Sequence, residues 1–181
     1  MAEIRKTGMS QGDLVQFLTD VLEVVNPIRT ALVGDNLWTT AALAVGTVGS
    51  NIGTGQVTYN INQGQYYKAA ASTTPSNSAV PDGTWGLLQV EIGTNGTIDI
   101  MSAAANGTGY STYAKAVAAK PTIQADHVEL GYAVFYTSGA NFTPGSTSFS
   151  AATVSTTFVN ATTTLSTLNA ANGGAALSLT V

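Results

Sequence analysis

The stretch WGLLQVEIGTNGTIDIM, residues 85–101, decides the fold, because two runs of alternating residues flank an Asn-Gly turn. This pattern is typical of a β-hairpin. A two-residue turn would pair Ile92 with Asp99 and mix the apolar and polar faces of the hairpin. A three-residue loop that ends at Gly96 instead pairs Ile92 with Ile98, and it places glycine where a left-handed residue is required. We therefore predict the three-residue loop.

Further strands are predicted from runs rich in Val, Ile, Thr and Tyr that are bounded by Gly, Pro, Asn or Ser. Besides the hairpin strands at 85–92 and 97–101, these runs cover residues 56–61, 66–72, 128–137 and 153–159. Short strands at this spacing are typical of all-β domains. The fold class is therefore mainly β, an antiparallel β-sandwich or small barrel preceded by a short N-terminal α-helix. A second helical segment is expected at 113–119.

The N-terminal helix is predicted at residues 10–25, with Ser10 as its N-cap and with Pro27 ending it. Its apolar residues recur at the alternating four- and three-residue spacing of a coiled coil, and further apolar residues widen that face. Such a helix either packs on its own domain or serves in docking and oligomerisation, and the sequence leaves both interpretations open. The candidate contact residues are Leu14, Phe17, Leu18, Val21, Leu22 and Val25.

Composition divides the chain into four parts. We predict a helical docking or oligomerisation segment at 1–32, a connector rich in Gly, Ala and Thr at 33–55, a β domain at 56–160 and a C-terminal tail at 161–181. The chain contains no charged side chain after Glu129. We expect the uncharged tail to be packed within an assembly, because an isolated tail of this kind usually frays.

Charged residues make up only 9% of the 181 residues, against about a quarter in typical soluble domains. The six Lys and Arg residues are scattered, so no cationic cluster predicts a nucleic-acid partner. The first ten residues lack the order of a signal peptide, and no apolar run approaches the roughly 20 residues that span a bilayer. We therefore expect no nucleic-acid or membrane partner, and synthesis in the cytoplasm.

Few side chains suit catalysis or metal binding. The chain has no cysteine and one histidine, His127, whose neighbour Asp126 would point to the opposite face of a strand. In the predicted hairpin Glu91 and Asp99 face each other on the solvent side, about 5 Å apart. Such a pair resembles the carboxylates of a retaining glycosidase or half of a calcium site. The alternatives are a solvated pair or one neutralised by Lys68, Lys115 or Lys120. We favour a structural role, and predict no enzyme, cofactor or metal site.

Aromatic residues offer a different surface. Tyrosines beside Asn and Thr donors are found on lectin-like faces, although most aromatic residues of a β domain fill its core. Tyr66 and Tyr67 cannot both point inwards from one strand, so at least one of them is available for glycan contact.

A resemblance adds to this interpretation. PDGTWGLLQVEIGTNGTIDI (81–100) followed by ADHVELGYAVFYTSGANFTPGSTSF (125–149) resembles a recurrent module of tailed-bacteriophage virion proteins. In that module a W-G-L-x-x-V-x-I hairpin precedes a G-Y strand and an F-x-P-G-x-T/S turn. It is similar to modules of capsid decoration proteins and head fibres, which are commonly trimers with an N-terminal anchoring segment. The likeness covers about a third of the chain and carries no catalytic residue.

The resemblance implies a non-enzymatic virion structural protein, made in the cytoplasm of a bacterial host. It would be a capsid decoration (cement) or head-fibre protein that forms a homotrimer and binds the major capsid protein or another virion protein. The alternative is a tail or baseplate fibre, or an adhesion module that binds host surface glycans.

Overall fold

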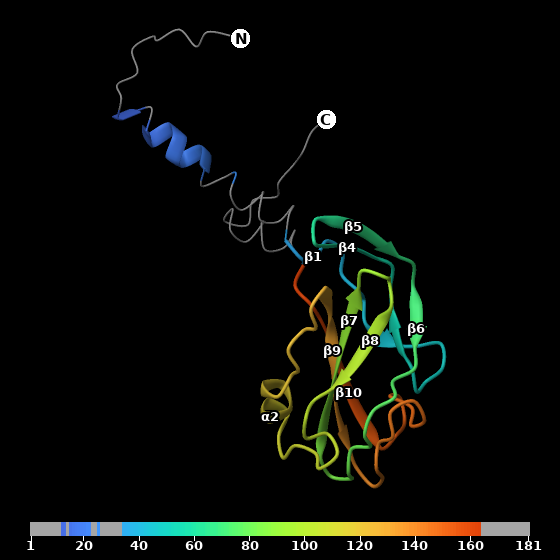
Figure 1. The fold of residues 1–181 in the computed structure, drawn as a ribbon. Coiled ribbons are helices and arrows are strands. Elements are labelled where there is room, and N and C mark those ends of the chain that lie inside the picture. Colours follow the sequence, from blue (N-terminus) through green and yellow to red (C-terminus); the bar gives the residue numbers. More distant parts are fainter. Residues whose placement is uncertain (1–11, 14, 23–24, 26–33, 164–181) are drawn as a thin grey trace.

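The computed structural model describes residues 12–13, 15–22, 25 and 34–163. It confirms the predicted mainly β fold, an antiparallel β-sandwich preceded by a short N-terminal helix (Figure 1). The strands are β1 (Asn36–Leu37), β2 (Ala44–Val45), β3 (Ile52–Thr54), β4 (Val57–Ile61), β5 (Gly64–Lys68), β6 (Ala71–Thr73), β7 (Trp85–Gly93), β8 (Ile98–Ser102), β9 (His127–Thr137) and β10 (Val154–Asn160). One helix, α2 (Tyr113–Ala118), lies between β8 and β9, and Thr112 caps it.

The largest sheet has the strand order β10-β9-β7-β8, and the hairpin of residues 85–102 forms its β7–β8 edge. Its register is the predicted one, with Ile92 opposite Ile98 and Val90 opposite Ile100. Gly96 adopts a φ of 73°, as the three-residue loop requires. The alternation of apolar and polar residues was therefore sufficient to fix this pairing.

Two three-stranded sheets, β1-β4-β5 and β2-β3-β6, share one long bent hairpin. The β3–β6 and β4–β5 pairs follow the same register on either side of a bend at residues 55–56 and 69–70. The bend divides the single strand predicted at 66–72 into β5 and β6, which belong to different sheets. Gly55 lies at the bend, where an added Cβ would come within 3.3 Å of Ala41 O.

The described part of the segment predicted as a connector, residues 34–55, belongs to the β domain, contrary to the sequence prediction. It supplies β1, β2 and β3, and its apolar side chains Leu37, Ala41, Leu43 and Ile52 are buried in the main core. The prediction failed because these strands have only two or three residues, too few for a periodic pattern to emerge between glycines.

A β-bulge interrupts β9 where it pairs with β7. Gly131 lies opposite Val90 and Glu129 lies opposite Glu91, so Leu130 is the extra residue. The bulge changes which positions face the main core, from Val128 and Leu130 before it to alternate residues from Ala133 onward. Gly131 has a φ of 139°, and an added Cβ would lie 2.2 Å from Val159 O on β10. Only glycine fits this position without displacing β10.

Each face of the four-stranded sheet has its own cluster of buried residues. The main core lies between this sheet and the two smaller ones, where four phenylalanines pack in a chain: Phe135, Phe142, Phe149 and Phe158. On the opposite face α2 covers a smaller cluster, to which it contributes Ala116; the other buried members are Leu87, Ala103 and Val134. Figure 1 shows β7 and β9 between α2 on one side and β6 on the other.

The N-terminal helix is confirmed, and in Figure 1 it lies outside the β-sandwich. Its described apolar side chains are exposed. Leu14 and residues 164–181 of the predicted tail lie outside the described residues.

Candidate functional site

Three carboxylates form a row across the α2-covered face of the large sheet. Glu91 on β7 lies directly opposite Asp99 on β8, and opposite Glu129 on β9. Residues opposed in this way have their Cβ atoms about 5 Å apart, so three negative charges in a row would repel one another without compensation. The segment that follows α2, residues 119–127, supplies that compensation.

Each carboxylate has its own partner in this segment. Lys120 Nζ lies 2.6 Å and 2.8 Å from the two carboxylate oxygens of Glu129. Gln124 donates to both oxygens of Glu91, from its backbone N at 3.1 Å and from its side-chain amide. His127 Nε2 lies 3.0 Å from Asp99 Oδ2. Three contacts therefore fasten the segment to three neighbouring strands.

The solvent-facing position predicted for Glu91 is wrong, because Glu91 is fully buried. The segment 119–127 covers Glu91. This segment has no periodic pattern, so its sequence did not predict that it would pack over the sheet. Lys120 pairs with Glu129 rather than with Glu91 or Asp99, and Lys115 contacts Ser111. Among the described residues, no group of three or more His, Cys, Asp or Glu side chains is arranged to hold a metal ion.

His127 links the β9 strand to β8 through both ring nitrogens, each of which faces an oxygen acceptor; the protonated imidazolium can donate to both. Its Nδ1 lies 2.8 Å from the Ala125 carbonyl oxygen, and its Nε2 faces the Asp99 carboxylate. The hydrogen bond to Ala125 raises the pKa of His127 above its usual 6.5; burial opposes this shift, and the hydrogen bond to Asp99 and the charges of Glu91 and Asp99 add to it. Asp126 lies in the turn just before β9, with a φ of 58°, and not in the strand as expected from the sequence; it accepts a hydrogen bond from the Asn62 amide.

The N-terminal helix carries the most exposed apolar surface among the described residues. The exposed fractions of its apolar side chains lie between 39% and 59%; these residues are Val15, Phe17, Leu18, Val21, Leu22 and Val25. Large apolar side chains are normally buried, and a contiguous apolar surface of this kind is typical of an interaction site. The predicted docking residues, apart from the undescribed Leu14, therefore lie exposed on one helix.

The two candidate glycan residues lie differently on β5. Tyr66 is half-buried and stacks on Tyr59 with a centroid distance of 5.4 Å, so it takes part in packing. Tyr67 is 62% exposed, and its hydroxyl donates to Gln56 Oε1 at 3.4 Å. Only Tyr67 offers an open aromatic face.

The comparisons with known proteins were made against family models, curated proteins and solved structures. None of them matches this chain. The described helices include none that is long and apolar enough to cross a bilayer.

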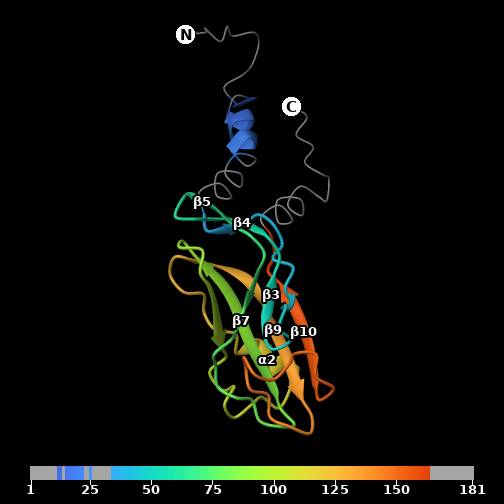
Figure 2. The ribbon, with the colours of Figure 1, turned by 90° about the vertical axis from the view of Figure 1, so that its right-hand side faces the viewer.

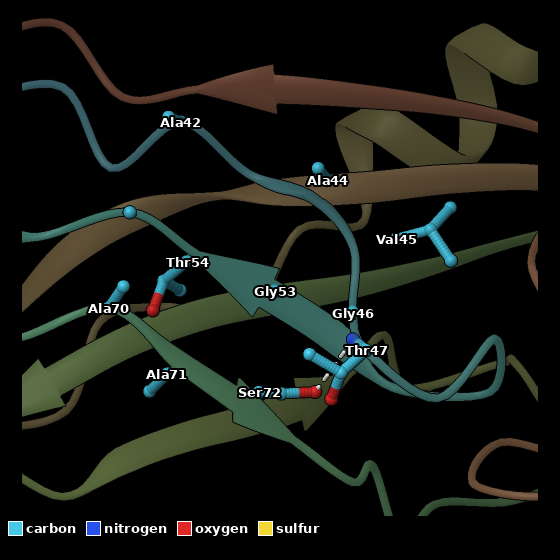
Figure 3. A pocket seen from close by; sticks show the side chains of 11 residues that line it. Ala42, Ala44, Val45, Gly46, Thr47, Gly53, Thr54, Ala70, Ala71 and Ser72 are labelled. Atoms are coloured by element: carbon cyan, nitrogen blue, oxygen red, sulfur yellow. Dashed lines mark hydrogen bonds between the residues drawn. The ribbon is translucent and has the colours of Figure 1, made fainter.

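A shallow hollow of about 380 Å³ lies on the β2-β3-β6 sheet (Figure 3). Small neutral residues line it: Ala42, Ala44, Val45, Gly46, Thr47, Gly53, Thr54, Gly55, Ala70, Ala71 and Ser72. Thr47 N donates to Ser72 Oγ at 3.3 Å within this lining. The lining brings no charged or aromatic side chain to the hollow, so it defines no catalytic chemistry.

Sequence reasoning missed two polar residues that matter on the α2-covered face. Gln124, in a loop, is the partner of Glu91. Gln89 on β7 is fully buried, and both polar atoms of its amide lack a hydrogen-bond partner among the described residues. The alternation in β7 places Gln89 and Glu91 on the same face, but nothing in the sequence shows that this face is covered.

Proposed function

We propose that this chain is a non-enzymatic structural protein of a tailed-bacteriophage virion, which assembles with copies of itself through its N-terminal helix. The β domain is then presented on the particle surface, as in capsid decoration proteins or head fibres. The proposal combines the exposed apolar helix with the resemblance of residues 81–100 and 125–149 to a virion module.

The exposed apolar face of the helix carries this proposal. Fully burying a Leu, Val or Phe side chain contributes roughly 1.5–3 kcal/mol, so six such residues provide a substantial drive for association. A helix this short is marginal in water by itself, because few hydrogen bonds offset the entropy of nucleation. Packing against a partner buries the apolar side chains and so supplies the stabilisation that the isolated helix lacks.

The spacing of the apolar residues indicates that the partner is another copy of the same helix. Leu14, Leu18, Val21 and Val25 are separated by four, three and four residues, which is the seam of a coiled coil. Gln16 falls on the outer side of this seam, where it donates to Asp20 at 2.7 Å. The trimeric state is taken from the resemblance, and the virion surface would be contacted by the assembled helices.

The α2-covered face supports a structural rather than a catalytic role for the carboxylates. Glu91 is buried under Gln124, while Asp99 and Glu129 are each paired with a cation or a histidine. A glycosidase needs two carboxylates that reach the substrate from a cleft. The contacts of these three residues instead join the segment after α2 to the sheet.

Light scattering and chemical cross-linking of the whole chain, alone and mixed with capsids, test the proposal. We expect a defined oligomer that binds the particle. A monomer that stays monomeric and unbound in both conditions would contradict it.

A second candidate function, adhesion to host glycans from a tail or baseplate fibre, is favoured by the exposed ring of Tyr67. Aromatic faces with neighbouring amides suit sugar rings, and Gln56 supplies such an amide. A glycan array with the native chain and with Tyr67→Ala tests this function, which requires a signal that the variant loses.

A further inference from the structure

The outward face of the β1-β4-β5 sheet carries an uncharged row of side chains. Tyr67 on β5 lies opposite Thr58 on β4. The amide of Trp38, just after β1, donates to Thr58 O at 2.9 Å, which continues the β1–β4 register by one residue. Opposed residues point to the same side of a sheet, so Trp38, Thr58 and Tyr67 form a row. Leu37 and Tyr59, which alternate with this row, are buried in the main core.

This sheet lies at the end of the β domain that leads to the N-terminal helix. Both Figure 1 and Figure 2 show β4 and β5 at the end nearest the helix. Eight residues, 26–33, join the last described helical residue to the described β domain, and they span at most about 30 Å if fully extended. Helices that associate therefore hold the β1-β4-β5 sheets of neighbouring copies close together.

We propose that the β5 edge of this face, where Gln65 and Tyr67 are exposed, is a second contact surface between copies. Asn60 on the central strand β4, opposite Gln65, is only 6% exposed, so the contact is made at the edge of the sheet and not at its centre. This inference rests on the proposed self-assembly. It adds that the copies also touch through their β domains, at the end next to the helix.

Tethering gives this contact its physical basis. A short linker raises the local concentration of a second module to roughly the millimolar range, so a patch too weak to act alone becomes occupied. Around the three-fold axis of a trimer, this patch meets a different part of the neighbouring copy, and an uncharged patch near the axis comes close to its symmetry copies without like-charge repulsion. Tyrosine is enriched at such contacts, because its ring is apolar and its hydroxyl still finds a partner.

The edge position of β5 fits the same role. Within the β1-β4-β5 sheet β5 pairs only with β4, so its other side is open among the described residues. An open edge beside an exposed aromatic residue favours a further chain, and a tethered second copy is the nearest one available. Gln65, two residues before Tyr67 on the same outward face, is exposed as well.

Single cysteines test this surface without interference, because the native chain has none. Tyr67→Cys, Gln65→Cys and the control Val48→Cys are placed in the whole chain, and their rates of reaction with a maleimide are measured. Val48 lies in the β2–β3 turn of the other small sheet and is 58% exposed, close to Tyr67. Each rate is compared with that of the same cysteine in a chain that also carries Leu18→Asp in the helix.

We expect the cysteines at 65 and 67 to react several-fold more slowly in the assembled chain than in the Leu18→Asp chain, and the cysteine at 48 to react equally in both. Equal rates at 65 and 67 in a chain that light scattering shows to be assembled would overturn this inference and leave self-assembly standing. They would also leave Tyr67 open to a glycan. A chain that does not assemble at all would instead overturn the proposed function. Gln65→Cys covers the case in which replacing Tyr67 itself weakens the contact.

Discussion

Glu91 and Asp99 lie directly opposite each other on β7 and β8, and they face different surroundings. The Asp99 side chain is 39% exposed and pairs with His127, whereas Glu91 is fully buried and accepts two hydrogen bonds from Gln124. The difference arises because the segment after α2 crosses over Glu91 and ends at His127. The alternation of apolar and polar residues alone would place Glu91 and Asp99 in solvent. In the structure both carboxylates instead hold the loop that follows α2.

Replacing Gln124 should weaken that attachment. In Gln124→Ala, one carboxylate oxygen of the buried Glu91 loses its side-chain donor, and we expect the free energy of unfolding to fall by about 1–3 kcal/mol. Chemical denaturation measures the change. Thr122→Ala, at an exposed position in the same segment, is the control and should lower stability far less. Equal stabilities for the two variants would show that the Gln124 contact contributes nothing.

The free energy of unfolding should also depend on pH through His127. Its pKa in the folded protein is raised above 6.5, first by the hydrogen bond to Ala125, so the imidazolium is stabilised by folding. This contribution is fully present below pH 6.5 and is lost as the pH rises through the raised pKa. Denaturation at a series of pH values should therefore show falling stability across this window. His127→Gln should reduce this fall in stability with rising pH. If the variant shows the same pH dependence of stability as the native chain, His127 is not its cause.

Gln89 should be a position where an apolar substitution stabilises the protein. Both polar atoms of its amide are buried and have no partner among the described residues, and such burial is unfavourable. Gln89→Leu should raise the free energy of unfolding by about 1–3 kcal/mol, because the desolvation of the amide is removed at similar volume. Gln65→Leu, on an exposed face, should change it little. A destabilised Gln89→Leu protein would mean that the amide is hydrogen-bonded in solution.

The bulge in β9 predicts a strict requirement at Gly131. A Cβ there would clash with Val159 O, and the φ of 139° is strained for other residues. Gly131→Ala should therefore cost at least about 2 kcal/mol of stability and disturb the β9–β10 pairing. Gly107→Ala, where an added Cβ would lie 3.8 Å from the Ser78 side chain, serves as the control in thermal melting. Similar melting temperatures for both variants would contradict the geometry.

Long runs with a regular period were predictable from the sequence, and short or irregular ones were not. The β7–β8 register followed from Ile92, Ile98 and the loop at Gly96. The strands β1 to β3 were missed because they are too short to show a period. The bulge at Leu130 inverts the alternation within β9, so no single period describes that strand.

Of the candidate sites, the helix surface was predictable from a local pattern and the surroundings of Glu91 were not. The docking residues of the helix share one apolar pattern, and those described are exposed in the structure as a surface for docking requires. The environment of Glu91 depends on Gln124, 33 positions further along the chain, in a segment whose path over the sheet follows from tertiary packing. Local sequence carries no information about such a contact, and only the fold brings the two residues together.

Sedimentation of the whole chain, compared with Leu18→Asp, tests self-assembly most directly. Leu18 lies on the predicted seam, and Gln16→Lys places a charge on the outer side of the same helix as a control. We predict that the native chain and Gln16→Lys sediment as the same trimer. Leu18→Asp should sediment as a monomer whose β domain melts at the native temperature. A native chain that is monomeric at every concentration, or a Leu18→Asp chain that remains a trimer, would contradict assembly through the helix.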